Sequence, residues 1–377
     1  MNMLLVIFCF SLISYLFYVG YFIVGWLRTP SFQSKDKLNK YPTISIIIPV
    51  RNEEEHIGKL LTDIQSQTYP EDYIEVLVIN DDSTDDTLKV IKELNYSNVK
   101  VLDLQVNEKI NAYKKRAITL GVQHSSAELI VTTDGDCRVG PHWLMKIVEY
   151  YIREDKQLIT APVSYHLQKN WFEKVQTVEF QFLIAAAAAC IKNGMPNTCN
   201  GANMAYKREL FHEIKGYEGI DNVASGDDEM LLHKVFKKDP SLVGFLKSDE
   251  AIVKTFAKSD WRGFIQQRKR WASKSTIFFD YRTSLMLASV FMLNVCLLVA
   301  LPLAFFFKEF FVFLSVAAVL KFLFDGFLIF QTLRFFSNKK LLPYLLLVEF
   351  LYTPYIVFVG IVGNFSSTYI WKGRTVR

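Results

Sequence analysis

The stretch "IVTTDGDCRVG", residues 130–140, is an apolar run of strand length that ends in two aspartates separated by one glycine. Carboxylates this close together repel each other unless a positive group lies between them. A Mg²⁺ or Mn²⁺ ion, bound by Asp134, Asp136 and the phosphates of a ligand, would remove that repulsion. The alternative is an ordinary turn whose acids cap the next helix. We favour the cation, because the pair ends a predicted buried strand and Gly135 permits a close approach of the backbone.

Three further apolar runs of strand length precede this one. They are "ISIIIPV" (44–50), "IEVLVIN" (74–80) and "NVKVLDL" (98–104). The segments between the runs have helical patterns, such as "STDDTLKVIKEL" (83–94), which opens with an N-capping residue and acids in its first turn. Strands that alternate with helices in this way predict an α/β fold with a mainly parallel central sheet.

Polar residues follow three of the predicted strands directly. These residues are Arg51 to Glu53, Asp81 and Asp82, and Asp134 to Asp136. In α/β sheets, ligands bind beyond the carboxyl ends of the strands. The sequence therefore predicts a ligand site at this edge of the sheet.

Motifs of several other enzyme classes do not occur in the sequence. No GxxxxGK[ST] and no GxGxxG follows a predicted strand, which argues against a P-loop or a Rossmann nucleotide site. There is no HExxH and the six histidines do not cluster, which argues against a zinc hydrolase. The five cysteines have no CxxC spacing, as is typical of reduced thiols in an intracellular protein. We also expect no nucleic acid among the partners.

Apolar segments lie on both sides of the mixed central part. Residues 3–26 carry no charge and are long enough to cross a bilayer as a helix. A secretory signal peptide is the rival interpretation, but the basic start, short apolar run and small-residue cleavage site that it needs are missing. Three more apolar stretches lie at 284–307, 310–333 and 341–369. We therefore expect an N-terminal transmembrane anchor (1–27), a catalytic domain (28–282) and a C-terminal membrane region (283–377).

The lysines and arginines next to these segments predict their orientation. Basic residues follow the first apolar segment and precede the second, which places residues 28–282 in the cytoplasm by the positive-inside rule. We expect an integral protein of a bacterial inner or cell membrane. Four simple crossings would put the basic tail "WKGRTVR" outside, so 341–369, which contains Pro354, is either a fourth crossing or a re-entrant pair. Within 310–333, Lys321 and Asp325 are spaced to pair on one helix face.

Five segments carry further information: "IIIPVRNEE", "VINDDSTDDT", "DGD" (the DxD motif), "SGDDEM" and "QQRKRW" (the QxxRW motif). In their order and spacing they resemble membrane-bound family 2 glycosyltransferases, over about residues 42–275. The resemblance implies a GT-A fold and transfer of a sugar from a nucleotide-sugar with inversion at the anomeric carbon.

The resemblance implies a site for the sugar donor. Pro49 to Glu53 would form the first nucleotide-contacting loop, with Glu53 at the base or ribose, and Asp82 would contact uracil. "YKKRAI" (113–118) is similar to the GKxxAL segment of the family, although Tyr113 replaces the usual glycine. The implied residues of the UDP-sugar site are Pro49, Arg51, Glu53, Asp82, Lys114, Asp134, Gln267, Arg270 and Trp271, with Asp136 and Asp134 at the Mg²⁺ or Mn²⁺ ion.

The resemblance also implies a catalytic base and an acceptor site. In "ASGDDEMLL" (224–232), Asp228 would take the proton from the attacking hydroxyl, and the alternative is a helix start decorated with acids. The family more often has Glu at the position of Asp227. "QQRKRW" is also interpretable as a basic amphipathic helix at the membrane surface, which is compatible with a role at the site. The implied acceptor residues are Asn203, Asp227 and Trp271.

The leading hypothesis is therefore an inverting glycosyltransferase that moves a sugar from a UDP-sugar to a membrane lipid or lipid-linked acceptor. One alternative is a processive polysaccharide synthase of the cellulose or hyaluronan type, which shares the QxxRW motif. A second is a membrane protein that binds nucleotide without catalysis, although such a protein would tend to lose Asp136 or Asp228. A soluble-type nucleotidyltransferase would leave Asp228 and QxxRW without a role.

Overall fold

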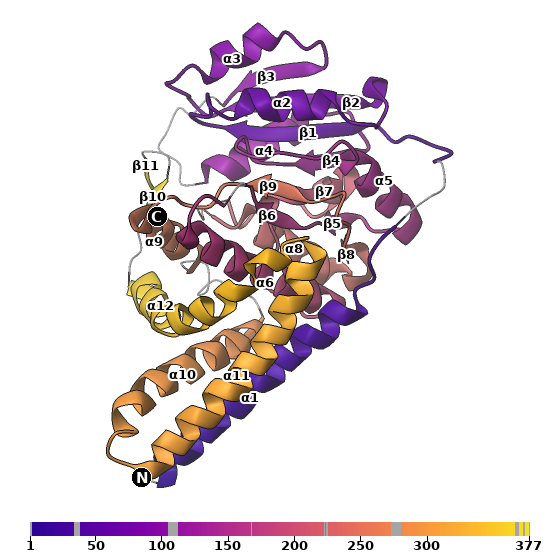
Figure 1. Ribbon diagram of the computed structural model, residues 1–377. Helices are drawn as coiled ribbons and strands as arrows, with labels where there is room; N and C mark the ends of the chain where they lie inside the picture. Colours follow the sequence, from indigo (N-terminus) through magenta and orange to yellow (C-terminus); the bar gives the residue numbers. More distant parts are fainter. Residues whose placement is uncertain are drawn as a thin grey trace. The chain divides into compact units, whose positions relative to one another are not determined.

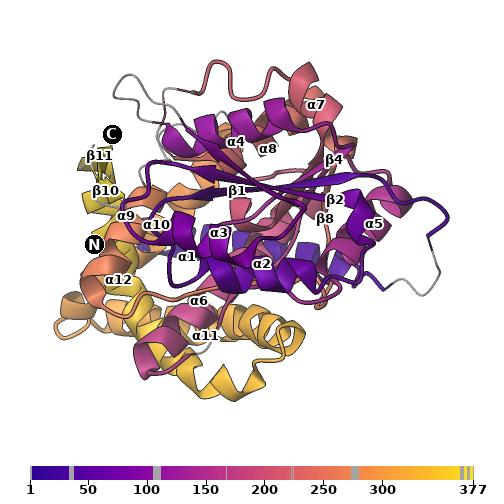
Figure 2. The same cartoon turned by 90° about the horizontal axis from the view of Figure 1, so that it is seen from above.

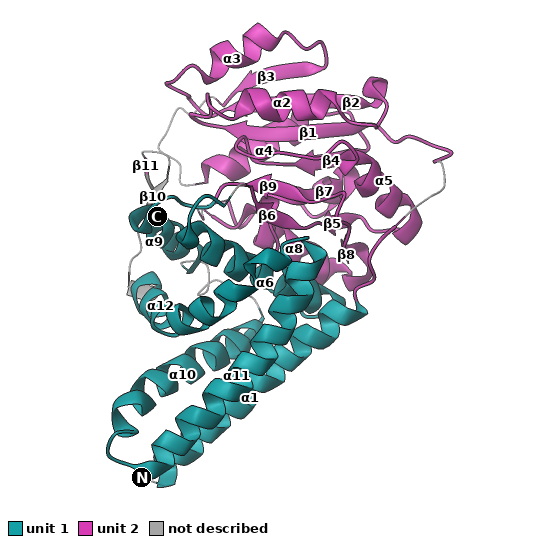
Figure 3. Cartoon of the chain, viewed as in Figure 1, with its two compact units in different colours: residues 1–28, 168–197, 257–369 teal, residues 29–167, 198–256, 370–377 magenta. Residues whose placement is uncertain are grey.

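The computed structural model describes residues 2–33, 38–104, 112–166, 168–221, 223, 225–272, 280–365, 369–371 and 374–376. Lys35, Lys37 and Lys274, which contribute to the orientation prediction, lie outside this part of the chain. Contacts within the chain divide it into two compact units (Figure 3). Unit 1 contains residues 1–28, 168–197 and 257–369, and unit 2 contains residues 29–167, 198–256 and 370–377. The predicted domain boundaries at 27 and 282 stay a prediction.

Unit 2 is built around a seven-stranded sheet with the strand order β3-β2-β1-β4-β7-β5-β8 (Figure 1). The first four strands in this order are parallel, whereas β7 is antiparallel to both of its neighbours. The predicted α/β fold with a mainly parallel sheet is confirmed. The strands are β1 (Ile44–Val50), β2 (Ile74–Asn80), β3 (Val99–Asp103), β4 (Leu129–Thr132), β5 (Leu158–Thr160), β7 (Met204–Lys207) and β8 (Val243–Phe245).

The central strands are apolar throughout because both faces of the sheet are covered. Ile44, Ile46, Ile47 and Ile48 of β1 are fully buried, although successive side chains point to opposite faces. In Figure 2, α2 and α3 lie on one face of the sheet and α4 on the other. The helices of unit 2 are α2 (Ile57–Gln65), α3 (Thr87–Leu94), α4 (Tyr113–His124), α5 (Trp143–Glu154), α7 (Arg208–Glu213) and α8 (Asp227–Lys238).

Two small sheets complete the strands. One is formed by β6 (Val163–Tyr165) and β9 (Val253–Thr255), which are parallel. The other is formed by β10 (Tyr369–Trp371) and β11 (Arg374–Val376) near the end of the chain.

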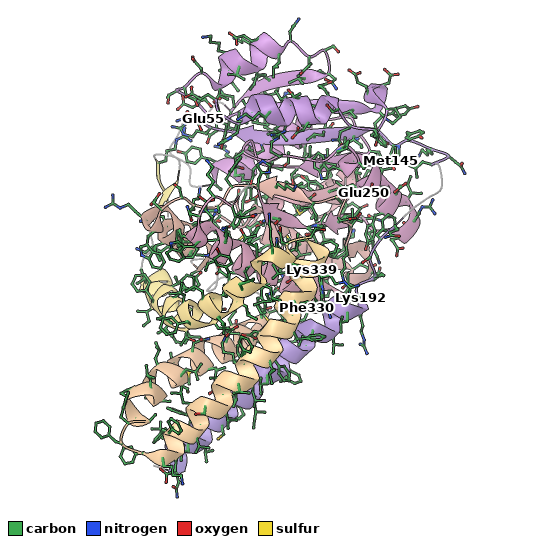
Figure 4. The ribbon with its side chains drawn as sticks, in the orientation of Figure 1. Glu55, Met145, Lys192, Glu250, Phe330 and Lys339 are labelled. Atoms are coloured by element: carbon green, nitrogen blue, oxygen red, sulfur yellow. The ribbon has the colours of Figure 1, made fainter. Side chains whose placement is uncertain are left out.

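Unit 1 consists of helices. In the described residues, five helical segments are long and apolar enough to cross a membrane, namely Asn2–Arg28, Trp171–Lys192, Tyr281–Leu303, Lys308–Phe335 and Lys339–Gly363. The outer side chains of α10 and α11 are mostly carbon (Figure 4). The helices are α1 (Asn2–Arg28), α6 (Trp171–Lys192), α9 (Trp261–Ala272), α10 (Tyr281–Leu303), α11 (Lys308–Phe335) and α12 (Leu345–Phe365).

Three features of these helices bear on the sequence analysis. The second segment of the five, α6, is not among the predicted membrane segments; its Ala185 to Ala189 are buried. In the described part of 341–369, the end of a 3-10 helix (Lys339–Tyr344) leads into one continuous α-helix, α12, which has Pro354 inside it. The predicted pair of Lys321 and Asp325 is present, with 2.7 Å between Nζ and Oδ2.

Candidate active site

The carboxyl ends of β2, β1 and β4 lie next to one another, because these three strands are parallel neighbours. Each end is followed by one of the predicted polar groups, so residues 51–53, 81–82 and 134–136 meet at one edge of the sheet. Asn52 and Asp82 have positive φ angles of 53° and 54°. Such conformations are uncommon for residues other than glycine and concentrate at functional sites.

Arg51 and Glu53 hold the first of these loops in place. Nη1 of Arg51 donates hydrogen bonds to the backbone oxygens of Asp81 and Asp82, each at 2.7 Å. The backbone N–H of Glu53 donates to Oγ1 of Thr87 at 2.8 Å, and the Glu53 side chain is buried. The described contacts of both residues are thus internal, while their predicted contacts with the nucleotide stay predictions, as does that of Pro49 in β1.

Gly135 allows the DxD segment to pack against this loop. A Cβ atom at position 135 would lie 3.0 Å from Cγ1 of Val50 and 3.1 Å from Cγ of Glu53. Both distances are tighter than ordinary van der Waals contacts. The absence of a Cβ at position 135 therefore lets the DxD segment approach this loop closely.

Lys114, at the start of α4, joins the acids of two different elements. Its Nζ atom lies 2.7 Å from Oδ1 of Asp134 and 3.3 Å from Oδ2 of Asp227. Burial alone would lower the pKa of Lys114, but the nearby carboxylates of Asp134, Asp227 and Asp228 outweigh it and raise the pKa above its usual value. Lys114 is therefore a cation at neutral pH, and part of the positive charge that the aspartate pair requires comes from the chain itself.

Asp136 differs from Asp134 in its surroundings. It is half-buried, and in the described part of the chain its carboxylate has no ion pair; its one described contact is the Cys137 thiol, 3.8 Å from Oδ1. No group of three or more His, Cys, Asp or Glu side chains is placed to hold a metal among the described residues. A Mg²⁺ ion bound at Asp136 would thus take most of its ligands from phosphates and water. Mg²⁺ is usually coordinated in this way in proteins.

Asp227 and Asp228 form the start of α8, beside a glycine of another segment. Asp228 accepts hydrogen bonds from the backbone N–H of Gly201 at 3.0 Å and from that of Glu229 at 2.8 Å. These two bonds orient its carboxylate. Asp227 is buried next to Lys114. The structure therefore brings Lys114, Asp134, Asp227 and Asp228 into one cluster.

Gly201 makes this cluster possible. A Cβ atom at position 201 would lie 2.9 Å from Oδ2 of Asp227, 3.4 Å from Cβ of Asp228 and 3.5 Å from Nζ of Lys114. In the structure, the space beside Gly201 is taken by these charged side chains.

Gly201→Ala is expected to lower kcat about tenfold or more, because displacing a reacting group by a fraction of an ångström already weakens catalysis. The measurement is steady-state sugar transfer by the purified variant. Gly140→Ala is the matched control, since its new Cβ would lie 3.8 Å from the nearest atom, the oxygen of Glu250. Equal activity of the two variants would show that the packing at Gly201 does not matter for the reaction.

Asn203 does not fit its predicted role in acceptor binding. The residue is fully buried, and its Oδ1 accepts a hydrogen bond from the Trp143 indole N–H at 2.9 Å. Its Nδ2 donates to the backbone oxygens of Pro162 and Ala251, both at 2.8 Å. The amide therefore joins three segments of unit 2, and no surface of Asn203 remains for a ligand.

The QxxRW residues Gln267, Arg270 and Trp271 lie on α9 in unit 1, and their predicted contacts with sugar donor and acceptor stay predictions. The Trp271 ring stacks on Phe180 of α6, with 5.9 Å between the centroids. The guanidinium of Arg268 lies 4.1 Å from the centre of the Trp271 ring and pairs with Glu179. The sequence analysis did not predict the ion pair of Arg268 and Glu179. The one signal for it was the position of Arg268 between Gln267 and Arg270 of the QxxRW motif.

Arg374, near the end of unit 2, was also missed. Its Nη1 lies 2.8 and 2.9 Å from the two carboxylate oxygens of Asp81, and its Nη2 lies 3.1 Å from Oδ2 of Asp82. Its Cζ is 4.2 Å from the centre of the Tyr113 ring. The basic composition of the tail was the one available signal.

The comparisons with known proteins agree with this geometry. Residues 45–215 match the model of glycosyl transferase family 2. The chain is 26% identical over 286 residues to poly-beta-1,6-N-acetyl-D-glucosamine synthase of Staphylococcus epidermidis. The matched region covers 71% of this chain and 65% of that protein. It is 28% identical over 162 residues to 4,4'-diaponeurosporenoate glycosyltransferase of Staphylococcus haemolyticus, 42% of each chain. These matches span less than two thirds of the length of either curated relative.

A solved structure shows the same fold. The mannosyltransferase of Pyrobaculum calidifontis in complex with GDP-Man and Mn²⁺ matches with a TM-score of 0.58 at 17% identity, over 92% of this chain and 99% of that one. The fold is thus the GT-A fold. Residues 45–215 carry the similarity to glycosyl transferase family 2.

Proposed function

We propose that the protein is an inverting glycosyltransferase that moves a sugar from a UDP-sugar to a membrane lipid or a lipid-linked acceptor. The observation that carries the proposal is the cluster of Lys114, Asp134, Asp227 and Asp228, together with Asp136, which lies two residues after Asp134 in the same segment. It combines a cation, a carboxylate suited to a metal ion, and an oriented carboxylate suited to act as a base. The base would activate the acceptor hydroxyl, and the cation and the metal ion would stabilise the departing diphosphate.

In this proposal, the metal ion is Mg²⁺ or Mn²⁺ and the residue that holds it is Asp136. When bound, the ion would stabilise the departing diphosphate. Lys114, charged and held by Asp134, would add a second positive charge near the phosphates. Support for a divalent ion comes from the solved mannosyltransferase, which carries Mn²⁺ together with GDP-Man.

The proposed base is Asp228. The bonds from the N–H groups of Gly201 and Glu229 hold its carboxylate in one orientation, and a positioned carboxylate accepts the proton of an attacking hydroxyl. The carboxylate of Asp227, next to Asp228, forms an ion pair with Lys114 and would influence the acceptor through its negative charge. The acceptor oxygen would bond to the anomeric carbon as the diphosphate leaves from the opposite face, and the hydroxyl proton would pass to Asp228; this single displacement gives an inverted product.

The proposed acceptor and location rest on the apolar helices. Of the five helical segments with the length and composition of membrane spans, the four other than α6 lie almost entirely outside residues 28–282, which suits a substrate presented at a bilayer. We therefore propose a protein of the bacterial inner or cell membrane, with residues 28–282 as a cytoplasmic catalytic domain. One relative is named as a glycosyltransferase of 4,4'-diaponeurosporenoate, which supports an acceptor other than a sugar chain.

A second candidate function is the synthesis of a polysaccharide. It is favoured by the similarity to poly-beta-1,6-N-acetyl-D-glucosamine synthase, which extends over 71% of this chain. The two functions differ in the size of their products, since a synthase adds many sugars to one chain.

The proposal is tested by nucleotide release from a panel of UDP- and GDP-sugars, using the detergent-purified full-length protein, membrane lipid extract and Mg²⁺ or Mn²⁺. We expect release from a UDP-sugar that depends on the lipid extract and stops when EDTA removes the metal. Release from GDP-sugars alone would replace the donor in the proposal. No release from any donor, while nucleotide and metal still bind, would support the binding-only alternative.

A further inference from the structure

A buried ion pair within unit 1 joins α6 to α9, the helix that carries the QxxRW residues (Figure 3). It is formed by Glu179 of α6 and Arg268 of α9, whose side chains are 9% and 2% exposed. Neither residue belongs to the charged cluster of unit 2, and neither occupies one of the three named positions of the motif. A role for the pair therefore has to follow from what it contacts.

Stability alone does not explain a pair of this kind. Moving two charges out of water costs about as much as their attraction returns, and apolar side chains of similar volume often stabilise a protein equally well or better. Phe264, one turn before Arg268 on the same face of α9, is an apolar residue in the same position and is 5% exposed. The ion pair must provide something that apolar packing does not.

Arg268 contacts two of the three motif residues directly. Its Nη1 donates a hydrogen bond to Oε1 of Gln267 at 3.3 Å. Its Cζ lies 4.1 Å from the centre of the Trp271 ring, within the range of a cation–π contact. Arg268 thus holds Gln267 through the amide oxygen and Trp271 through the indole ring.

Helix α6 supports both parts of this arrangement. Glu179 neutralises and orients the guanidinium, and the next residue, Phe180, stacks on the Trp271 ring with 5.9 Å between the centroids. A guanidinium can donate to a carboxylate and an amide in its plane while its face contacts a ring, and neither a lysine nor an apolar side chain can do all three. The contacts of the pair are therefore those of a support for Gln267 and Trp271.

We propose that Glu179 is a positioning residue for the QxxRW motif. By pairing with Arg268, it holds the guanidinium at Gln267 and Trp271 and so fixes the orientation of both motif side chains for sugar transfer. The proposal rests on the proposed function, because it assumes that these two side chains contact the sugar donor or the acceptor. It adds to that function a residue 89 positions before its partner, on a helix that none of the five motifs includes.

Glu179→Gln is expected to lower the rate of sugar transfer about tenfold or more, because a small displacement of a positioned group already weakens catalysis. The rate is measured with the purified full-length protein, the preferred UDP-sugar, Mn²⁺ and membrane lipid extract. Glu173→Gln is the matched control. It makes the same change at another buried acid of α6, whose described bonds are to Lys169 and Asn170, and it should leave the rate unchanged.

Two combined variants separate positioning from a purely structural role. Glu179→Met together with Arg268→Met removes both charges, so the Tm should equal or exceed that of the unchanged protein. Transfer should nevertheless stay about tenfold reduced, because Gln267 and Trp271 have lost the guanidinium. When Gln267 and Trp271 are both replaced by alanine, Glu179→Gln should lower the residual rate by no more than about twofold, since nothing is left to position.

Normal transfer by Glu179→Gln or by the double methionine variant would overturn the proposal, because the pair would then serve the fold alone. A tenfold effect of Glu179→Gln in the alanine background would also overturn it. If the alanine replacements themselves leave transfer unchanged, the predicted role of the motif fails and the inference with it. If the unchanged protein transfers no sugar from any donor, the failure lies with the proposed function, whereas impaired alanine variants beside a fully active Glu179→Gln would refute only the present inference.

Discussion

Asp228→Asn is expected to reduce kcat about 10²- to 10⁴-fold, the range over which general bases act, while leaving the affinity for the nucleotide nearly unchanged. Asparagine has the size of aspartate but accepts no proton at neutral pH. Its one oxygen can still accept from Gly201 or Glu229, so the start of α8 keeps most of its local structure. The measurement is single-turnover transfer at saturating sugar donor, together with a Kd for the nucleotide.

Asp155→Asn is the control for this change. Asp155 is exposed at the end of α5 with a φ of 50°, a conformation that asparagine adopts readily, so the same substitution there should be silent. Activity of Asp228→Asn within a few-fold of the unchanged protein would contradict the assignment of the base. In that case, Asp227 would be the next residue to replace.

Asp136→Asn is expected to give the second large effect, a fall in kcat/KM of about 10²- to 10⁴-fold, because a metal ion contributes several kcal/mol to stabilising a departing phosphate. Unlike Asp228→Asn, this variant should also lose the metal-dependent part of nucleotide binding. Calorimetry of UDP with and without Mn²⁺ measures that part directly. Asp136 has no ion pair among the described residues, so its replacement leaves no buried cation behind.

A comparison with Asp134→Asn sharpens this prediction. Asp134 bonds to Lys114, so its replacement changes the charge balance of the cluster and should affect binding even without a metal. Asp136→Asn should affect binding only when the metal is present. If UDP binds to Asp136→Asn with the same dependence on Mn²⁺ as to the unchanged protein, the metal site lies elsewhere.

Much of the fold of unit 2 could be predicted because it is encoded locally. Buried parallel strands are apolar throughout, as in 44–50 and 74–80, and the polar residues that follow them are adjacent in sequence. The position of the ligand site then follows from the general behaviour of parallel sheets. The five motifs together predicted the similarity to family 2 glycosyltransferases, which no single motif would have indicated.

The parts that were missed depend on contacts between distant residues. Asn203 is an internal residue because Trp143, Pro162 and Ala251 surround it, which no local pattern reveals. The contact between Arg374 and Asp81 joins residues that are 293 positions apart. Tertiary packing, rather than residue type, decides whether a polar side chain faces a ligand.

The helices of unit 1 illustrate the same limit. Segment 171–192 is less apolar than the other candidate spans, because Glu173, Glu179 and glutamines lie among its apolar residues. The pairing of Glu179 with Arg268 accounts for one of these acids. The composition of one segment reveals a charged residue, but it does not reveal the ion-pair partner that another segment provides.

The most direct test of the central claim is the mass of the product. The full-length protein is incubated with its preferred UDP-sugar, Mn²⁺ and membrane lipid extract, and the lipids are analysed by mass spectrometry beside samples made with Asp228→Asn. We predict one lipid species that gains the mass of a single transferred sugar, and the loss of that species with Asp228→Asn. A ladder of masses would identify a polysaccharide synthase, and an unchanged lipid profile despite nucleotide release would contradict glycosyl transfer to a lipid.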